Sequence, residues 1–195
     1  MSEAGANNRA VPEKRHLPGE EGVWVFIGGD MLVFAVFFVA FLFARMETLP
    51  LFETSQATLD RGLGLLNTVL LLTSSWCVAR AVKQARAGRA GGQRMVLGAM
   101  GLGLGFVVVK AVEYTAKVSA GYTLNTNEFF IYYFMFTGIH LLHVLIGLGV
   151  LAYTASRFGK DSLPSNGMGL LEGTGAFWHL VDLLWIVLFA LFYLI

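Results

Sequence analysis

Long apolar segments alternate with short polar connections along this chain. An α-helix needs about 20 predominantly apolar residues to cross the hydrocarbon core of a bilayer. Five segments meet or approach that length, at approximately 22–44, 63–80, 95–117, 129–153 and 174–195. The second is the shortest, and Arg61 and Arg80 bound it. The pattern predicts an all-α fold: a polytopic membrane helical bundle of five transmembrane helices.

The first twenty residues differ from the rest of the chain. They are polar and contain Pro12 and Pro18, and the apolar stretch that follows is too long for the h-region of a cleavable signal peptide. We therefore expect a flexible polar N-terminal tail over residues 1–20 and one transmembrane domain over residues 21–195.

Basic residues are distributed unevenly among the connections. The segment between the second and third apolar stretches carries five cations and no acid: Arg80, Lys83, Arg86, Arg89 and Arg94. Three more lie in the N-terminal tail. Positive charge gathers on the cytoplasmic side of membrane proteins, so the N-terminus is predicted to be cytoplasmic. The basic segment is also a candidate contact for anionic lipid.

Composition supports a membrane protein and excludes several classes of site. Hydrophobic residues make up 56% of the 195 residues and charged residues only 14%, whereas a soluble domain carries about 25% charged residues. A single cysteine, Cys77, excludes an internal disulfide and a multi-thiolate metal site within this chain. With a net charge of +1, we expect neither nucleic acid nor a soluble small-molecule substrate as a partner.

Glycines recur within the apolar stretches. Small residues let helix backbones approach closely in lipid, where no hydrophobic force acts between helices. They are therefore expected to mark helix contacts. The glycines concerned are Gly28, Gly29, Gly98, Gly101, Gly103, Gly105, Gly147 and Gly149.

The last apolar stretch contains three ionisable residues, Glu172, His179 and Asp182. Such groups are costly in hydrocarbon, about 2.5–3.5 kcal/mol for a charged side chain at a helix centre, so each needs a partner or a function. Asp30 lies at a comparable depth in the first stretch. The economical hypothesis is a polar seam linking the first, fourth and fifth spans, in which Asp30, His143, His179 and Asp182 satisfy one another. Asp30 is also a candidate for proton movement.

In each of two further groups of ionisable residues, the spacing places the side chains on one face of a helix. Lys110, Glu113 and Lys117 follow one another at intervals of three and four, so Glu113 can pair with either lysine. His140 and His143 are three apart. They could reach a metal or a carboxylate together, but a tetrahedral zinc site needs about four donors. Hydrogen bonding to neighbouring helices is the simpler interpretation.

Several of these segments resemble one family in the family's order. The run from Glu172 to Trp185 is similar to the last-helix motif of cytochrome c oxidase subunit III, F-E-A-A-A-W-Y-W-H-F-V-D-V-V-W. Residues 137–144, Thr-Gly-Ile-His-Leu-Leu-His-Val, resemble its T-G-F-H-G-L-H-V. Residues 66–68 and 70–75 are similar to its L-N-T…L-L-x-S-S element, and Glu113-Tyr114 match its E-Y pair.

The chain departs from that family in two respects. Most mitochondrial-type members have seven spans, and this chain has five. The family's carbodiimide-reactive glutamate corresponds to Asp30, within Gly28-Gly29-Asp30-Met31. This short form looks most like the NorE-type branch found with nitric oxide reductases, or like bacterial subunit III of other haem-copper oxidases.

The resemblance implies an accessory, non-redox subunit in the bacterial inner membrane. It would bind no cofactor itself and would stabilise a haem-containing catalytic subunit, which carries haem and copper or iron. Only three histidines lie in the spans, too few to ligate such centres. The family's lipid cleft implies possible phospholipid contact for Glu113, His140, His143, Glu172, His179 and Asp182. The alternatives are an independent proton- or ion-coupled transporter and a haem- or metal-binding membrane cytochrome.

Overall fold

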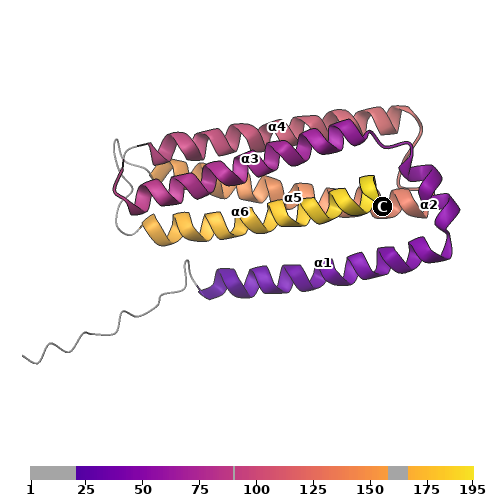
Figure 1. The fold of residues 1–195 in the computed structure, drawn as a ribbon, viewed down its shortest axis with the longest axis horizontal. Coiled ribbons are helices and arrows are strands. Elements are labelled where there is room, and N and C mark those ends of the chain that lie inside the picture. Colours follow the sequence, from indigo (N-terminus) through magenta and orange to yellow (C-terminus); the bar gives the residue numbers. More distant parts are fainter. Residues whose placement is uncertain (1–20, 90, 158–166) are drawn as a thin grey trace, which may run out of the picture.

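The computed structural model describes residues 21–89, 91–157 and 167–195, and all regular secondary structure in these ranges is helical (Figure 1). The predicted N-terminal tail lies outside the described residues. The elements are α1 (Glu21–Glu47), α2 (Leu49–Gln56), α3 (Arg61–Arg86), α4 (Gly92–Ser119), α5 (Glu128–Arg157), α6 (Met168–Phe189) and a terminal π-helical turn, η2 (Ala190–Leu194). Five of these helices are long and apolar enough to cross a membrane. The predicted multi-pass helical bundle is confirmed.

The short helix α2 was not predicted. The sequence suggested only a connection there, because eight residues are too few to show a helical period and Pro50 stands at the start. Tertiary packing stabilises the helix. The ring of Phe52 is fully buried, with its centroid 5.4 Å from that of Phe41 on α1 and 5.7 Å from that of Phe129 on α5. A helix this short is marginal without such contacts.

Local signals set both ends of α3. The Asp60 side chain accepts hydrogen bonds from the backbone N–H groups of Gly62 (2.8 Å) and Leu63 (3.1 Å), which caps the first turn. Beyond the last turn, Gly88 and Gly91 have φ values of 62° and 109°, a region that favours glycine. These two residues turn the chain from α3 into α4.

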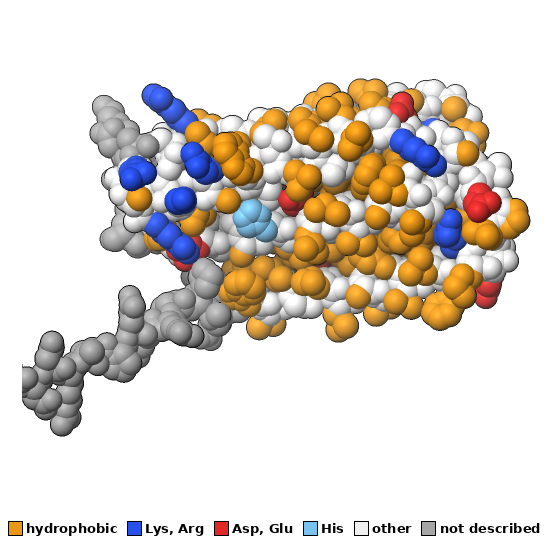
Figure 2. All heavy atoms as spheres, viewed as in Figure 1, with side chains coloured by type: hydrophobic (Ala, Val, Ile, Leu, Met, Phe, Trp, Pro, Cys, Tyr) orange, Lys and Arg blue, Asp and Glu red, His pale blue; other side chains and the backbone are white. Residues whose placement is uncertain are grey.

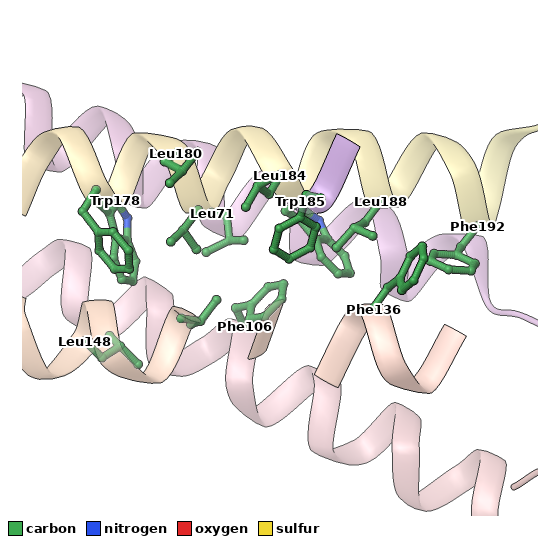
Figure 3. Packing of buried hydrophobic residues seen from close by; sticks show 14 of the residues in the cluster. Leu71, Phe106, Phe136, Leu148, Trp178, Leu180, Leu184, Trp185, Leu188 and Phe192 are labelled. Atoms are coloured by element: carbon green, nitrogen blue, oxygen red, sulfur yellow. The ribbon is translucent and has the colours of Figure 1, made fainter. Parts of the chain in front are cut away.

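Helices α3 to α6 form the core, and α1 lies along one side of it (Figure 1). The α6 side chains Trp178 and Trp185 are fully buried (Figure 3). Trp185 meets Phe106 of α4 edge to face, with ring centroids 4.8 Å apart. In contrast, α1 exposes a series of apolar side chains, among them Val36 and Phe43. It is the least enclosed of the five long helices.

Only some of the glycines mark helix contacts. A Cβ atom on Gly147 would lie 2.7 Å from the Trp178 ring, and one on Gly103 would lie 3.0 Å from the same ring. The indole of Trp178 therefore fits between α4 and α5 because both positions lack a side chain. The expectation is wrong for Gly28, Gly29, Gly101 and Gly149, where a Cβ would meet no atom within 4 Å.

Candidate functional site

The two ionisable residues that connect α1 to α5 form a pair. Oδ1 of Asp30 lies 3.1 Å from Nε2 of His143, and each side chain is only 12% exposed. The ring of Phe34 covers the imidazole edge to face at 5.8 Å. Part of the predicted polar seam is thus present in the structure.

Hydrogen-bond chemistry constrains the protons of this pair. Nδ1 of His143 lies 2.8 Å from the carbonyl oxygen of Ile139, which can only accept, so Nδ1 carries a hydrogen. Nε2, on the other side of the ring, faces Oδ1 of Asp30 at 3.1 Å. The second carboxyl oxygen, Oδ2 of Asp30, is buried without a hydrogen-bond partner among the described residues.

His140 does not join His143, although the two are one helical turn apart. It is fully buried, 5.4 Å from the Trp185 ring and 5.7 Å from the Phe106 ring between centroids. Neither ring nitrogen has a hydrogen-bond partner within the described part of the chain. The two histidines therefore point to different surroundings, α1 for His143 and the bundle core for His140.

The predicted seam is divided, because His179 pairs with α3 rather than with Asp30. Its Nδ1 atom lies 2.6 Å from the Ser75 hydroxyl. Asp182 lies one turn further along α6, and its Oδ1 atom is buried without a hydrogen bond in the described residues. The prediction that all four groups satisfy one another is corrected to two separate pairs, Asp30–His143 and Ser75–His179.

Sequence reasoning missed the role of the polar residues of α3. Ser74 accepts a hydrogen bond from Nε1 of Trp178 (3.0 Å) and donates one to the carbonyl of Ala99 on α4 (2.8 Å). Thr68 accepts from Nε1 of Trp185 at 3.0 Å. With Ser75, these residues form a series of hydrogen bonds between α3 and α6. The family-like L-N-T and S-S motifs contained this signal, but only the fold shows that both motifs face α6.

Glu172 forms an ion pair with Arg86 at the end of the bundle where the polar connections gather. Its Oε1 atom lies 2.9 Å from both Nε and a terminal nitrogen of Arg86. Both residues line an open groove between α1, α3 and α6 with a volume of about 530 Å³, which His179 also lines. The remaining walls of this groove are largely apolar.

The intrahelical pair predicted within the third span is present, and it is buried. Nζ of Lys110 lies 2.9 Å from Oε2 of Glu113, and both side chains are almost fully buried. The hydroxyls of Tyr133 on α5 and Tyr193 on η2 both donate to Oε1 of Glu113, and both lie within 3.2 Å of Nζ. The pair is therefore neutralised and satisfied by hydrogen bonds, as a buried ion pair requires.

Lys117 takes no part in that cluster. Its ammonium group instead donates a hydrogen bond to the backbone carbonyl of Thr58, in the connection between α2 and α3. The alternative in which Glu113 pairs with Lys117 is not what the structure shows. Lys117 ties the end of α4 to its neighbouring connection.

The five cations near the α3–α4 turn do not share one environment. Arg80, Lys83 and Arg89, together with Gln84 and Ala87, line one pocket of about 280 Å³. Arg86 is paired with Glu172, and Arg94 is exposed on α4. Lys and Arg side chains gather at this end of the molecule (Figure 2).

Within the described ranges, no three histidine, cysteine, aspartate or glutamate side chains lie close enough to hold a metal ion. Among the predicted residues, the fold joins Asp30 to His143 and Lys110 to Glu113, and it pairs His179 with Ser75, which was not predicted. These arrangements can fix helices and hold protons. The prediction that this chain binds no cofactor stays a prediction.

The fold and these pairs define a polytopic membrane protein whose ionisable groups connect its helices. Residues 5–195 match the family model described as cytochrome c oxidase subunit III, and the chain belongs to that family. It is thus an accessory, non-redox membrane subunit of the haem-copper oxidase type. The matches give no support to an independent transporter.

Three relatives illustrate the range of the family. Cytochrome c oxidase subunit 3 of Alkalihalophilus pseudofirmus is 28% identical over 190 residues, covering 94% of this chain and 91% of the relative. Quinol oxidase subunit 3 of Bacillus subtilis is 29% identical over 180 residues, covering 89% and 85%. Haem-copper oxidase subunit I+III of Aeropyrum pernix is 26% identical over 184 residues, covering 89% of this chain but 22% of that much longer protein.

Proposed function

We propose that this chain assembles with a haem-containing catalytic subunit in a bacterial inner membrane and stabilises it there. The fused relative supports the proposal, because its printed name places subunits I and III in one chain and this chain matches a fifth of it. A fusion fixes at the covalent level an association that separate chains must form by contact.

The Asp30–His143 pair is the observation that carries a specific role within that complex. It links α1 to α5, and α1 is otherwise the least enclosed of the long helices. The pair lies in the half of the bundle that the basic residues predict to be cytoplasmic. We assign it two tasks: holding α1 on the bundle, and keeping an exchangeable proton close to the side from which the catalytic subunit takes protons.

The reaction of the catalytic partner stays a prediction. Five spans and the Gly28-Gly29-Asp30-Met31 sequence favour the nitric oxide reductase-associated branch. The relatives reported above are named for cytochrome c oxidase, quinol oxidase and haem-copper oxidase, which favours an oxygen-reducing partner. Both are haem-copper superfamily complexes, so the proposed role of the chain is the same in each.

Two substitutions of Asp30 separate the two tasks. In Asp30→Asn, the amide can donate to Nε2 of the neutral imidazole, so the helix contact is kept while the exchangeable proton is lost. In Asp30→Ala, both are lost. We expect the purified Asp30→Asn complex to keep its haem spectrum and subunit content and to lose activity sooner during turnover. Asp30→Ala is expected to assemble poorly as well.

The two variants also give the outcomes that contradict the proposal. An Asp30→Asn complex with the turnover lifetime of the unaltered protein would leave the pair a purely structural role. A lost haem spectrum in a fully assembled Asp30→Asn complex would contradict the assignment of this chain as a subunit remote from the redox centres.

A further inference from the structure

The pocket at the end of α3 gathers three cations, and none of the described residues that line it is acidic. Arg80, Lys83 and Arg89 line it, and residues 80–94 contain no aspartate or glutamate. The nearby Glu172 is already paired with Arg86, at 2.9 Å. Three exposed cations around one hollow of about 280 Å³ attract an anion.

An apolar stripe on α3 leads directly to this pocket. Leu65, Val69, Leu72 and Trp76 are each about half exposed, from 46% to 56%. They follow one another at intervals of four, three and four residues, and Arg80 and Lys83 continue the series at four and three. Residues at these intervals share one helix face. The cations and the apolar side chains therefore form one continuous surface.

Trp76 and Arg80 mark the point where this surface changes from apolar to charged. The guanidinium carbon of Arg80 lies 5.3 Å from the centre of the Trp76 ring. Tryptophan is enriched at membrane–water interfaces, and arginine extends toward the headgroups. Half of a hydrocarbon core about 30 Å thick corresponds to roughly ten helical residues, so an acyl chain anchored at Arg80 would reach Val69.

Gln84 adds an uncharged polar group to the same pocket. Its Oε1 atom is buried and has no hydrogen-bond partner among the described residues. The glutamine adds no charge, so the charge of the pocket comes from its three cations, which suit a phosphate.

We propose that this surface is a specific site for one anionic glycerophospholipid, with its phosphate held by Arg80, Lys83 and Arg89 and an acyl chain lying along Leu72 and Trp76. Arg86 and Arg94 are outside the site. The site needs no catalytic subunit, so it stands or fails separately from the proposed function. Its ligand is a lipid rather than a free phosphate, because only a lipid has an acyl chain that can pack along the apolar stripe.

Trp76 provides a direct test. The full chain carrying Trp24→Phe, which leaves Trp76 as the exposed indole on the apolar surface, is reconstituted into vesicles of phosphatidylcholine and phosphatidylglycerol. Two samples are compared: in one, only the phosphatidylglycerol carries brominated acyl chains, and in the other, only the phosphatidylcholine does. Brominated chains quench the fluorescence of a neighbouring indole. At equal mole fraction, brominated phosphatidylglycerol is expected to occupy the site in preference to brominated phosphatidylcholine by a factor on the order of five or more, because each cation near an anionic lipid contributes about a five-fold increase in affinity.

Matched variants identify the cations responsible. Lys83→Gln/Arg89→Gln keeps the Arg80–Trp76 contact and should lower the preference at least several-fold, because two of the three cations are removed. Arg94→Gln/Arg157→Gln removes the same charge from the predicted cytoplasmic side outside the pocket and should leave it unchanged. If both double variants lost the preference for phosphatidylglycerol equally, a general surface potential would explain it and the site would be overturned. An unchanged preference in Lys83→Gln/Arg89→Gln would overturn the site as well. Relief of quenching by soluble glycerol phosphate at the same concentration as the lipid would overturn the lipid assignment.

Discussion

Nε2 of His143 lies 3.1 Å from Oδ1 of Asp30, and this contact joins α1 to α5 where both side chains are largely shielded from solvent. Its Nδ1 hydrogen is already donated to the Ile139 carbonyl, so turning the ring away from Asp30 would also break that hydrogen bond. The two residues are therefore held as a unit.

That unit predicts energetic coupling between Asp30 and His143. Asp30→Ala and His143→Ala should each destabilise the chain, and the double variant should cost less than the sum by roughly 0.5–3 kcal/mol. Unfolding of the chain in detergent micelles by increasing dodecyl sulfate measures the three values. Leu32→Ala and Leu142→Ala, which alter exposed side chains on the same two helices, provide the additive control. Strict additivity for Asp30 and His143 would contradict the pairing.

The Lys110–Glu113 cluster predicts a destabilised single variant that a second substitution rescues. Lys110→Met leaves the buried Glu113 carboxylate without its counter-charge and should cost about 3–5 kcal/mol. In Lys110→Met/Glu113→Gln, the amide oxygen still accepts from Tyr133 and Tyr193, and most of that loss should be recovered. The same unfolding measurement compares the two. A double variant less stable than the single one would mean that the tyrosine hydroxyls, rather than the charge, control this cluster.

The fit of Trp178 between α4 and α5 predicts that a single methyl group matters at Gly147. Gly147→Ala places a Cβ 2.7 Å from the Trp178 ring and should destabilise the bundle by about 1–3 kcal/mol through overpacking. Gly149→Ala, on the same helix, meets no atom within 4 Å and should be neutral or slightly stabilising, since alanine is the better helix former. Equal effects at the two positions would contradict close packing at Gly147.

The hydrogen bonds between α3 and α6 predict a marked difference between two neighbouring polar residues. Ser74→Ala removes the acceptor of the Trp178 indole N–H and should cost about 1–3 kcal/mol, because a buried donor is left unpaired. Thr73→Ala alters an exposed side chain that bonds only its own helix, to the Val69 carbonyl, and should change stability by less than about 0.5 kcal/mol. Thermal unfolding of the two variants in one detergent distinguishes them.

Hydrophobic length and charge were sufficient to predict the five long helices, because both act within a segment. The Lys110–Glu113 pair was predictable for the same reason, since three residues along a helix are always neighbours. The partners of His179 and Glu172 were not. They lie on α3, and single-helix periodicity does not show which neighbour each helix face meets. Helix α2 was missed because its stability comes from the aromatic packing of Phe52, which belongs to no local pattern.

Purification of the epitope-tagged chain from native membranes in a mild detergent tests the account most directly. We predict that a haem-containing subunit accompanies the chain, and that the chain separated from this partner shows no haem absorption. An isolated chain that carries its own haem spectrum, or that moves protons across reconstituted vesicles without any partner, would contradict the account.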